Sequence, residues 1–162
     1  MRMHSVIAAT ALLIAAAAPA LAQQAAADPV ASMRAGREQF EKSCKLCHGL
    51  DRALALTRDT PGWEAIVKRM VAYGAPLNAA QRPEVVRYLA TRSVFAAKCA
   101  ACHEATRVVS DKPGPRDWKA LTERMAGHLR DLERQGKAPA GGEFTPAELA
   151  DIAALLQVVL PE

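Results

Sequence analysis

Residues 44–70 read CKLCHGLDRALALTRDTPGWEAIVKRM, and residues 99–125 read CAACHEATRVVSDKPGPRDWKALTERM. Each stretch begins with two cysteines three residues apart, and a histidine follows the second cysteine directly. Each then carries a tryptophan and a methionine at the same distances downstream. Matched spacing over such a length marks two copies of one structural unit.

The two copies align at a constant offset, so that residue 44 falls on residue 99. The coinciding pairs are Phe40 and Phe95, Cys44 and Cys99, Cys47 and Cys102, His48 and His103, Trp63 and Trp118, Ala65 and Ala120, Arg69 and Arg124, and Met70 and Met125. After Met125 the second copy carries an insertion, GKAPAGGEF, whose glycines, proline and alanines predict a surface loop. We therefore expect one unit over residues 23–92 and a second over residues 93–162.

Helical patterns account for both units. They are AGREQFEKSC (35–44), WEAIVKRM (63–70), PEVVRYLA (83–90), TRSVFAAKC (91–99), WKALTERM (118–125) and TPAELADIAALLQVVL (145–160). In residues 63–70 the apolar side chains recur at helical spacing, and proline stands near the start of the 83–90 and 145–160 segments, as at many helix starts. No segment alternates as a strand would. The sequence predicts an all-α protein made of two tandem small helical units.

No flexible linker separates the units, because the 83–90 helix runs almost directly into the 91–99 helix. We expect Thr91 and Ser93 to cap helix ends at a change of direction between the units. Two units joined in this way would keep a fixed position relative to each other.

Residues 1–22 have the layout of a secretory signal peptide. A basic residue, Arg2, precedes an apolar run, and small residues at Ala20 and Ala22 precede two glutamines. The alternative is a retained membrane anchor, but the run is shorter than the roughly 20 apolar residues that span a bilayer. We expect cleavage after Ala22 and a soluble periplasmic protein.

The charges of the remaining chain are nearly balanced and unevenly distributed. Residues 23–162 carry 20 basic and 17 acidic side chains, which is too small an excess to predict nucleic-acid binding. Residues 23–98 carry a formal +5, whereas residues 99–162 carry −2. We expect the first unit to dock an acidic partner.

The spacing Cys-x-x-Cys-His is the attachment signature of c-type haem. Two thiols three residues apart can reach the two vinyl groups of one porphyrin, and the next histidine can ligate the iron. A bound macrocycle would also add apolar surface to a core that has only seven aromatic residues. We expect two c-type haems, bound through Cys44 and Cys47 with His48, and through Cys99 and Cys102 with His103.

Three other uses of these cysteines compete with haem attachment. A redox dithiol of the thioredoxin kind needs a βαβ setting that this sequence lacks. Structural disulfides suit an exported protein, and four cysteines with two histidines could hold zinc. None of these three requires a histidine after both pairs, or a tryptophan and a methionine at matched positions.

With these motifs, the chain resembles the bacterial dihaem c-type cytochromes over essentially all of residues 23–162. GREQFEKSCKLCH resembles their opening helix, with Gly36 and Phe40 before the haem motif, and PEVVRYLA resembles their closing helix. The chain departs from many members in having no Met-Pro sequence. Its helical Trp…Arg-Met segments are similar to those of the cytochrome subunits of periplasmic dehydrogenases, including sulfite-oxidising ones.

The resemblance implies a second axial ligand for each iron. The candidates in residues 23–162 are Met33, Met70, Met125 and His128. Met70 suits the first haem, although it could simply pack on the apolar face of its helix. Met125 suits the second haem by repeat position, and His128, which falls on Tyr73, is the alternative.

The repeated tryptophans and arginines have two possible roles. Trp63, Trp118, Arg69 and Arg124 could hold haem propionates, as tryptophan does in similar cytochromes. Alternatively, the tryptophans belong to the core and the arginines to a solvated helix face.

If both irons are six-coordinate, neither has an open position for a substrate, and the protein transfers electrons without bond chemistry of its own. We expect a periplasmic relay between redox partners, acting as a carrier or as the electron-accepting subunit of a dehydrogenase. The alternative is a haem enzyme or sensor with one five-coordinate iron, peroxidase-like or gas-binding. The known dihaem peroxidases are, however, much longer than this chain.

Overall fold

The computed structural model describes residues 28–100, 102, 116–138 and 142–160 of the 162-residue chain. These residues form the helices α2 (Pro29–Cys44), α3 (Asp51–Leu54), α4 (Thr60–Ala72), α5 (Gln81–Val94), the π-helix η1 (Phe95–Cys99), α7 (Trp118–Arg134) and α8 (Pro146–Val159). No strand occurs among them, so the all-α class is confirmed for the described residues. The expected signal peptide, residues 1–22, lies outside them.

Side-chain caps fix where the longer helices begin. Asp59 accepts a hydrogen bond from the backbone N–H of Gly62 at 3.0 Å at the start of α4, and Asp117 accepts one from Ala120 at the start of α7. Thr145 and Glu148 form a reciprocal capping box at the start of α8. Such caps satisfy backbone donors that a helix start would otherwise leave unpaired. The predicted start of the last helix at Thr145-Pro146 is confirmed.

The junction between the predicted units is one uninterrupted helical rod. Helix α5 ends at Val94, and η1 continues it directly to Cys99. The expected change of direction at Thr91 and Ser93 is wrong, because α5 continues through both residues, whose buried side chains cap neither end of this helix. The expected unit boundary after residue 92 therefore lies within α5.

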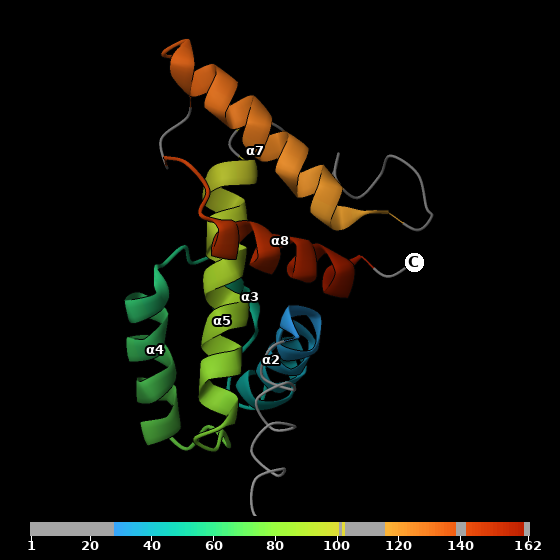
Figure 1. Ribbon diagram of the computed structural model, residues 1–162. Coiled ribbons are helices and arrows are strands. Elements are labelled where there is room, and N and C mark those ends of the chain that lie inside the picture. The colour runs from blue at the N-terminus through green and yellow to red at the C-terminus, as the bar shows by residue number, and fades with distance from the viewer. Residues whose placement is uncertain (1–27, 101, 103–115, 139–141, 161–162) are drawn as a thin grey trace, which may run out of the picture.

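Helix α5 occupies the centre of the fold. It packs against α2, α4 and α8, while α8 also packs against α2 and α7, and Figure 1 shows α8 crossing the α5 rod. The buried core joins residues from before and after the expected boundary, because Ala154 and Leu155 of α8 belong to the same cluster as Met33 and Phe40 of α2.

Gly36 lets α2 and α5 approach closely. A Cβ atom at this position would lie 2.2 Å from the carbonyl oxygen of Glu84. One turn further along, Phe40 packs against Tyr88 with ring centroids 5.8 Å apart. The small residue and the two aromatic rings together fix how α2 crosses α5.

Three basic side chains fasten α8 to the rest of the fold. Arg87 of α5 forms an ion pair with Asp151, and Lys98 of η1 pairs with Glu148. Arg37 of α2 donates to the carbonyl oxygen of Val158 at 2.8 Å, near the C-terminal end of α8.

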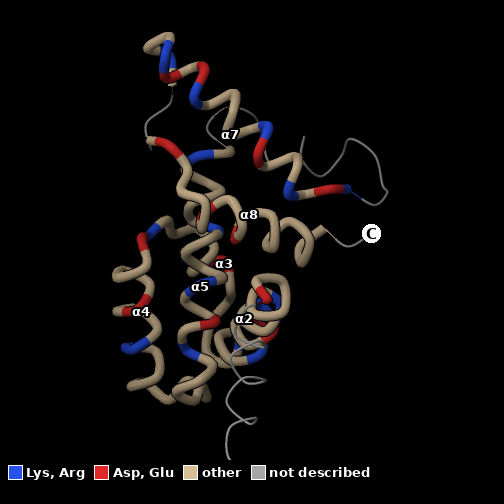
Figure 2. Tube along the Cα trace, viewed as in Figure 1, with Lys and Arg blue, Asp and Glu red and all other residues tan. Residues whose placement is uncertain are grey.

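Helix α7 is the most peripheral of the long helices and carries both signs of charge along its length (Figure 2). No helix in the described part of the chain is long and apolar enough to cross a membrane.

Candidate functional site

A cavity of about 420 Å³ brings together the four residues predicted to bind the first haem: Cys44, Cys47, His48 and Met70. Its volume falls in the range of about 300–1,000 Å³ that is typical of small-molecule and cofactor sites. Cys44 is the last residue of α2, Cys47 and His48 follow in the next turn, and Met70 projects from α4. Residues that are far apart in the sequence thus share one site.

The walls of the cavity are mainly apolar. They include Phe40, Ala53, Leu56, Trp63, Ile66, Val67, Ala75, Leu77 and Leu89, from α2, α3, α4, α5 and the segments between them. The predicted apolar face of the 63–70 helix is confirmed, because Trp63, Ile66, Val67 and Met70 all line this cavity. Met33, the other methionine considered for the first iron, is fully buried in the core and does not line it.

His48 makes a hydrogen bond that favours metal binding through its other ring nitrogen. Its Nδ1 lies 2.9 Å from the carbonyl oxygen of Gly49. A carbonyl oxygen can only accept, so Nδ1 is the donor in this contact, and in the neutral ring that leaves the lone pair on Nε2. Histidines that ligate metals commonly donate their second nitrogen to a backbone carbonyl in this way.

The four cysteines are free thiols, and two of them are held in apolar surroundings. Burial raises the pKa of Cys44. Burial first, and the neighbouring Cys102 second, raise the pKa of Cys99 to about 11, against a smaller opposing effect of Lys98. Reactive redox dithiols have lowered thiol pKa values, so these environments do not fit that alternative.

No cluster of three or more histidine, cysteine or acidic side chains suited to an ion occurs in the described ranges. The zinc alternative therefore gains no support there, and the described cysteines, all free, give none to the disulfide alternative.

Trp63 is a core residue whose polar atom is already used. Its side chain is 1% exposed, and its indole N–H donates to the Ser93 hydroxyl at 2.9 Å. Of the two roles considered for this tryptophan, the structure supports the core role. Trp118, at the matching repeat position, is half-buried and stacks against Arg116.

The second set of predicted residues is only partly described. Cys99 is half-buried at the end of η1, and Cys102 is exposed. On α7, Met125 is half-buried and His128 is exposed. His103 lies outside the described residues, as does the rest of the chain from 103 to 115.

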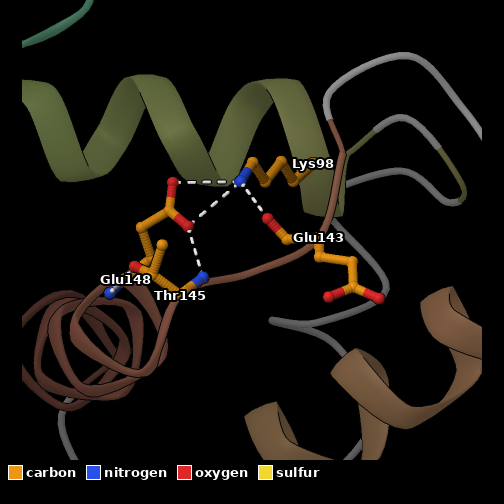
Figure 3. Close-up of polar contacts among 4 residues, drawn as sticks. All are labelled: Lys98, Glu143, Thr145 and Glu148. Carbon is orange, nitrogen blue, oxygen red and sulfur yellow. Dashed lines mark hydrogen bonds and ion pairs between the residues drawn. The ribbon is translucent and has the colours of Figure 1, made fainter.

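One structural parallel connects the two halves. Ser43, just before Cys44, donates to the carbonyl oxygen of Pro76 in the segment leading to α5. Lys98, just before Cys99, donates at 2.7 Å to the carbonyl oxygen of Glu143 in the segment leading to α8 (Figure 3). Both residues occupy the same repeat position. In each half, the residue before the first cysteine therefore ties the end of its helix to the segment that leads into a later helix, which is α5 for Ser43 and α8 for Lys98.

Lys98 makes further contacts that Ser43 cannot. Its ammonium lies 3.0 Å from both carboxylate oxygens of Glu148, which also accepts from the backbone N–H of Thr145 (Figure 3). The same ammonium lies 5.2 Å from the centre of the Phe144 ring. The end of η1 is therefore anchored to the start of α8.

Comparison with known families bears on the second half. Residues 90–156 match the family model described as cytochrome c oxidase, cbb3-type, subunit III. This match supports a c-type cytochrome. No curated protein and no solved structure matches the chain.

A cytochrome c domain implies haem c as the cofactor, electron transfer as the activity and other redox proteins as partners. The matched segment contains the second Cys-x-x-Cys-His motif and Met125.

Proposed function

We propose that this protein is a periplasmic dihaem c-type cytochrome that relays electrons between redox proteins through two covalently bound, six-coordinate haems. The observation that carries the proposal is the cavity in which Cys44, Cys47, His48 and Met70 meet. Two thiols, one imidazole and one thioether in an otherwise mainly apolar cavity are the donor set that a c-type haem requires.

Each residue of the first site has a defined task. The thiols of Cys44 and Cys47 would hold the porphyrin through its two vinyl groups, each S–H bond being replaced by a carbon–sulfur and a carbon–hydrogen bond with nothing lost. His48, through Nε2, and Met70, through its sulfur, would hold the iron. The haem would supply a one-electron Fe(III)/Fe(II) couple, which Met/His ligation would keep at high potential.

Three observations support a second haem. The motif Cys99–Cys102–His103 recurs with the spacing of the first, and the cytochrome family match covers it. The helices also pack in a repeated pattern: α2 and α4 pack on α5, and then α5 and α7 pack on α8. We assign Met125 as the sixth ligand of the second haem, because it shares the repeat position of Met70 and is less exposed than His128.

With both irons six-coordinate, the chain transfers electrons and catalyses no reaction of its own. The continuous α5–η1 rod ends at the second attachment motif and also forms part of the first site, so the two haems keep a fixed separation. A rigid pair of haems suits a relay from a donor, such as a periplasmic dehydrogenase, to an acceptor cytochrome or oxidase. The chain would serve as a free carrier or as the cytochrome subunit of that dehydrogenase.

The test is a redox-titrated absorbance spectrum of the mature protein, produced with haem-maturation machinery. Wild type is compared with Met70→Ala, Met125→Ala and His128→Ala, with Met33→Leu as a core methionine control. We expect two haems per chain. The ferric methionine–iron band should weaken with Met70→Ala and with Met125→Ala, and stay unchanged with His128→Ala and Met33→Leu.

Other outcomes contradict the proposal in distinct ways. A single haem per chain would remove the relay. A change with His128→Ala and none with Met125→Ala would make the second haem bis-histidine. A high-spin iron that binds carbon monoxide in the native reduced protein would favour the haem enzyme or sensor.

A further inference from the structure

Two arginines stand out among the residues that line the cavity. Among the described residues, Arg52 of α3 and Arg69 of α4 are the only basic side chains in its lining besides His48. No aspartate or glutamate of the described chain lines it. Both arginine side chains are exposed, which places them at the solvent side of the site. The cavity therefore combines a mainly apolar interior with two cationic groups at its edge.

Neither arginine side chain has a partner within the described part of the protein, where no hydrogen bond, ion pair or ring contact involves the guanidinium group of Arg52 or Arg69. Three arginines elsewhere in the fold are engaged. Arg37 binds Glu41 and Val158, Arg87 binds Asp151, and Arg92 lies over the ring of Tyr88. The two guanidinium groups of the cavity thus remain available to a ligand.

The same pair of arginines recurs in the second half of the sequence. At the repeat offset Arg52 falls on Arg107, and Arg69 falls on Arg124. Other lining positions do change between the repeats, since Leu56 falls on Asp111 and Tyr73 on His128. Two cationic positions per repeat match a ligand that carries two anionic groups.

We propose that Arg52 and Arg69 bind the two propionate carboxylates of the haem held by Cys44 and Cys47. The inference rests on the proposed function. It gives the propionates two arginine partners in place of the buried Trp63 indole, whose N–H already donates to Ser93. Guanidinium groups suit carboxylates because they can donate two parallel hydrogen bonds. The apolar porphyrin then fills the interior while its carboxylates meet the arginines at the solvent edge.

Binding in this way adjusts the potential of the first haem. A positive charge near the iron stabilises the reduced state, which carries one less positive charge. Replacing either arginine by glutamine therefore lowers the first midpoint potential. Because both groups are solvent-exposed, we expect about a threefold fall in the ratio of reduced to oxidised haem for each replacement.

The experiment is a potentiometric titration of the haem-loaded protein carrying Arg52→Gln, Arg69→Gln or both. For the double variant we expect the ratio of reduced to oxidised first haem to fall about tenfold at a fixed electrode potential. For a one-electron couple this is a midpoint potential lower by ~59 mV. Only one of the two midpoints should move. Lys68→Gln is the matched control for Arg69→Gln, because it removes the same charge from α4 at a residue that does not line the cavity. Arg52→Lys and Arg69→Lys should restore most of the potential.

Haem content, measured on the same samples, separates the two proposals. Two haems per chain with no shift in the double variant, or with an equal shift in Lys68→Gln, would overturn the propionate assignment and leave the cytochrome intact. Absence of covalent haem from the wild-type chain would overturn the proposed function itself.

Discussion

At the scale of single residues, Ser93 joins three parts of the first half. Its hydroxyl accepts hydrogen bonds from the Trp63 indole and from the backbone N–H of Arg58, and it donates to the carbonyl oxygen of Leu89. We expect Ser93→Ala to destabilise the haem-loaded protein by about 1–3 kcal/mol, because a buried indole N–H loses its acceptor.

The midpoint of urea unfolding measures this effect. Ser32→Ala, in the half-buried part of α2, is the control and should be neutral or slightly stabilising, because alanine is the better helix former. An unchanged midpoint for Ser93→Ala would mean that water replaces the lost hydroxyl.

Glu148 gives a prediction that depends on pH. Partial burial raises the pKa of this carboxyl, but the hydrogen bond from Thr145 and the Lys98 ammonium outweigh burial, so the pKa lies below its usual range. Its contribution to stability is therefore complete at neutral pH and is lost as the pH falls through the lowered folded-state pKa.

We expect Glu148→Gln to lower the urea midpoint at pH 7 and to lose this effect in acid, below the folded-state pKa, where wild-type Glu148 is protonated too. Glu123→Gln, on the exposed surface of α7, should change little at either pH. A difference between Glu148→Gln and wild type that is the same at pH 7 and in acid would show that the ion pair with Lys98 does not hold η1 to α8.

At the scale of helices, the crossing of α2 and α5 depends on Gly36. Gly36→Ala places a Cβ 2.2 Å from the Glu84 carbonyl oxygen, and neither backbone can shift without disturbing the Phe40–Tyr88 contact. We expect a destabilisation of about 1–3 kcal/mol, as for other overpacked sites.

A second glycine provides the comparison. Gly127 lies within α7, and a Cβ there would meet only the end of the flexible Arg130 side chain at 3.9 Å. Gly127→Ala should therefore stabilise the protein by about 0.5–1 kcal/mol through helix propensity. Thermal unfolding of both variants checks the pair. Equal effects would show that the crossing tolerates an extra methyl group.

At the scale of the whole molecule, the formal charge of residues 23–98 is positive and that of residues 99–162 is negative. Electrons should therefore pass between the first haem and small anionic redox probes at rates that fall as salt is added, since the Debye length shrinks to about 10 Å at 0.1 M. Stopped-flow kinetics with ferrocyanide, and with a neutral quinol as control, measures this dependence. Equal salt dependence for both probes would contradict it.

The same asymmetry predicts which haem has the higher potential. If the positive half holds the higher-potential haem, Met70→Ala should lower the higher of the two midpoints, and Met125→Ala should lower the other. The opposite assignment would show that local ligation and burial outweigh the net charge of each half.

The sequence by itself predicted the chemistry of the sites. Cys44, Cys47 and His48 are adjacent along the chain, so their spacing identifies a haem-attachment motif without any tertiary information, and helical periodicity placed Met70 on the same face as Trp63. It also determined the all-α class and the start of α8, because caps and apolar periodicity act within a few residues.

Only the tertiary structure decided how the halves join and which polar groups are free. Thr91 and Ser93 look like caps in the sequence, but packing against α2, α4 and α8 makes it favourable to continue α5 through them. The short helix α3, which carries Arg52 to the cavity, has no clear periodic signal in so few residues. Whether Trp63, Arg52 or Arg69 is available to a ligand depends on partners distant in sequence, such as Ser93, and such pairings form only when the helices pack.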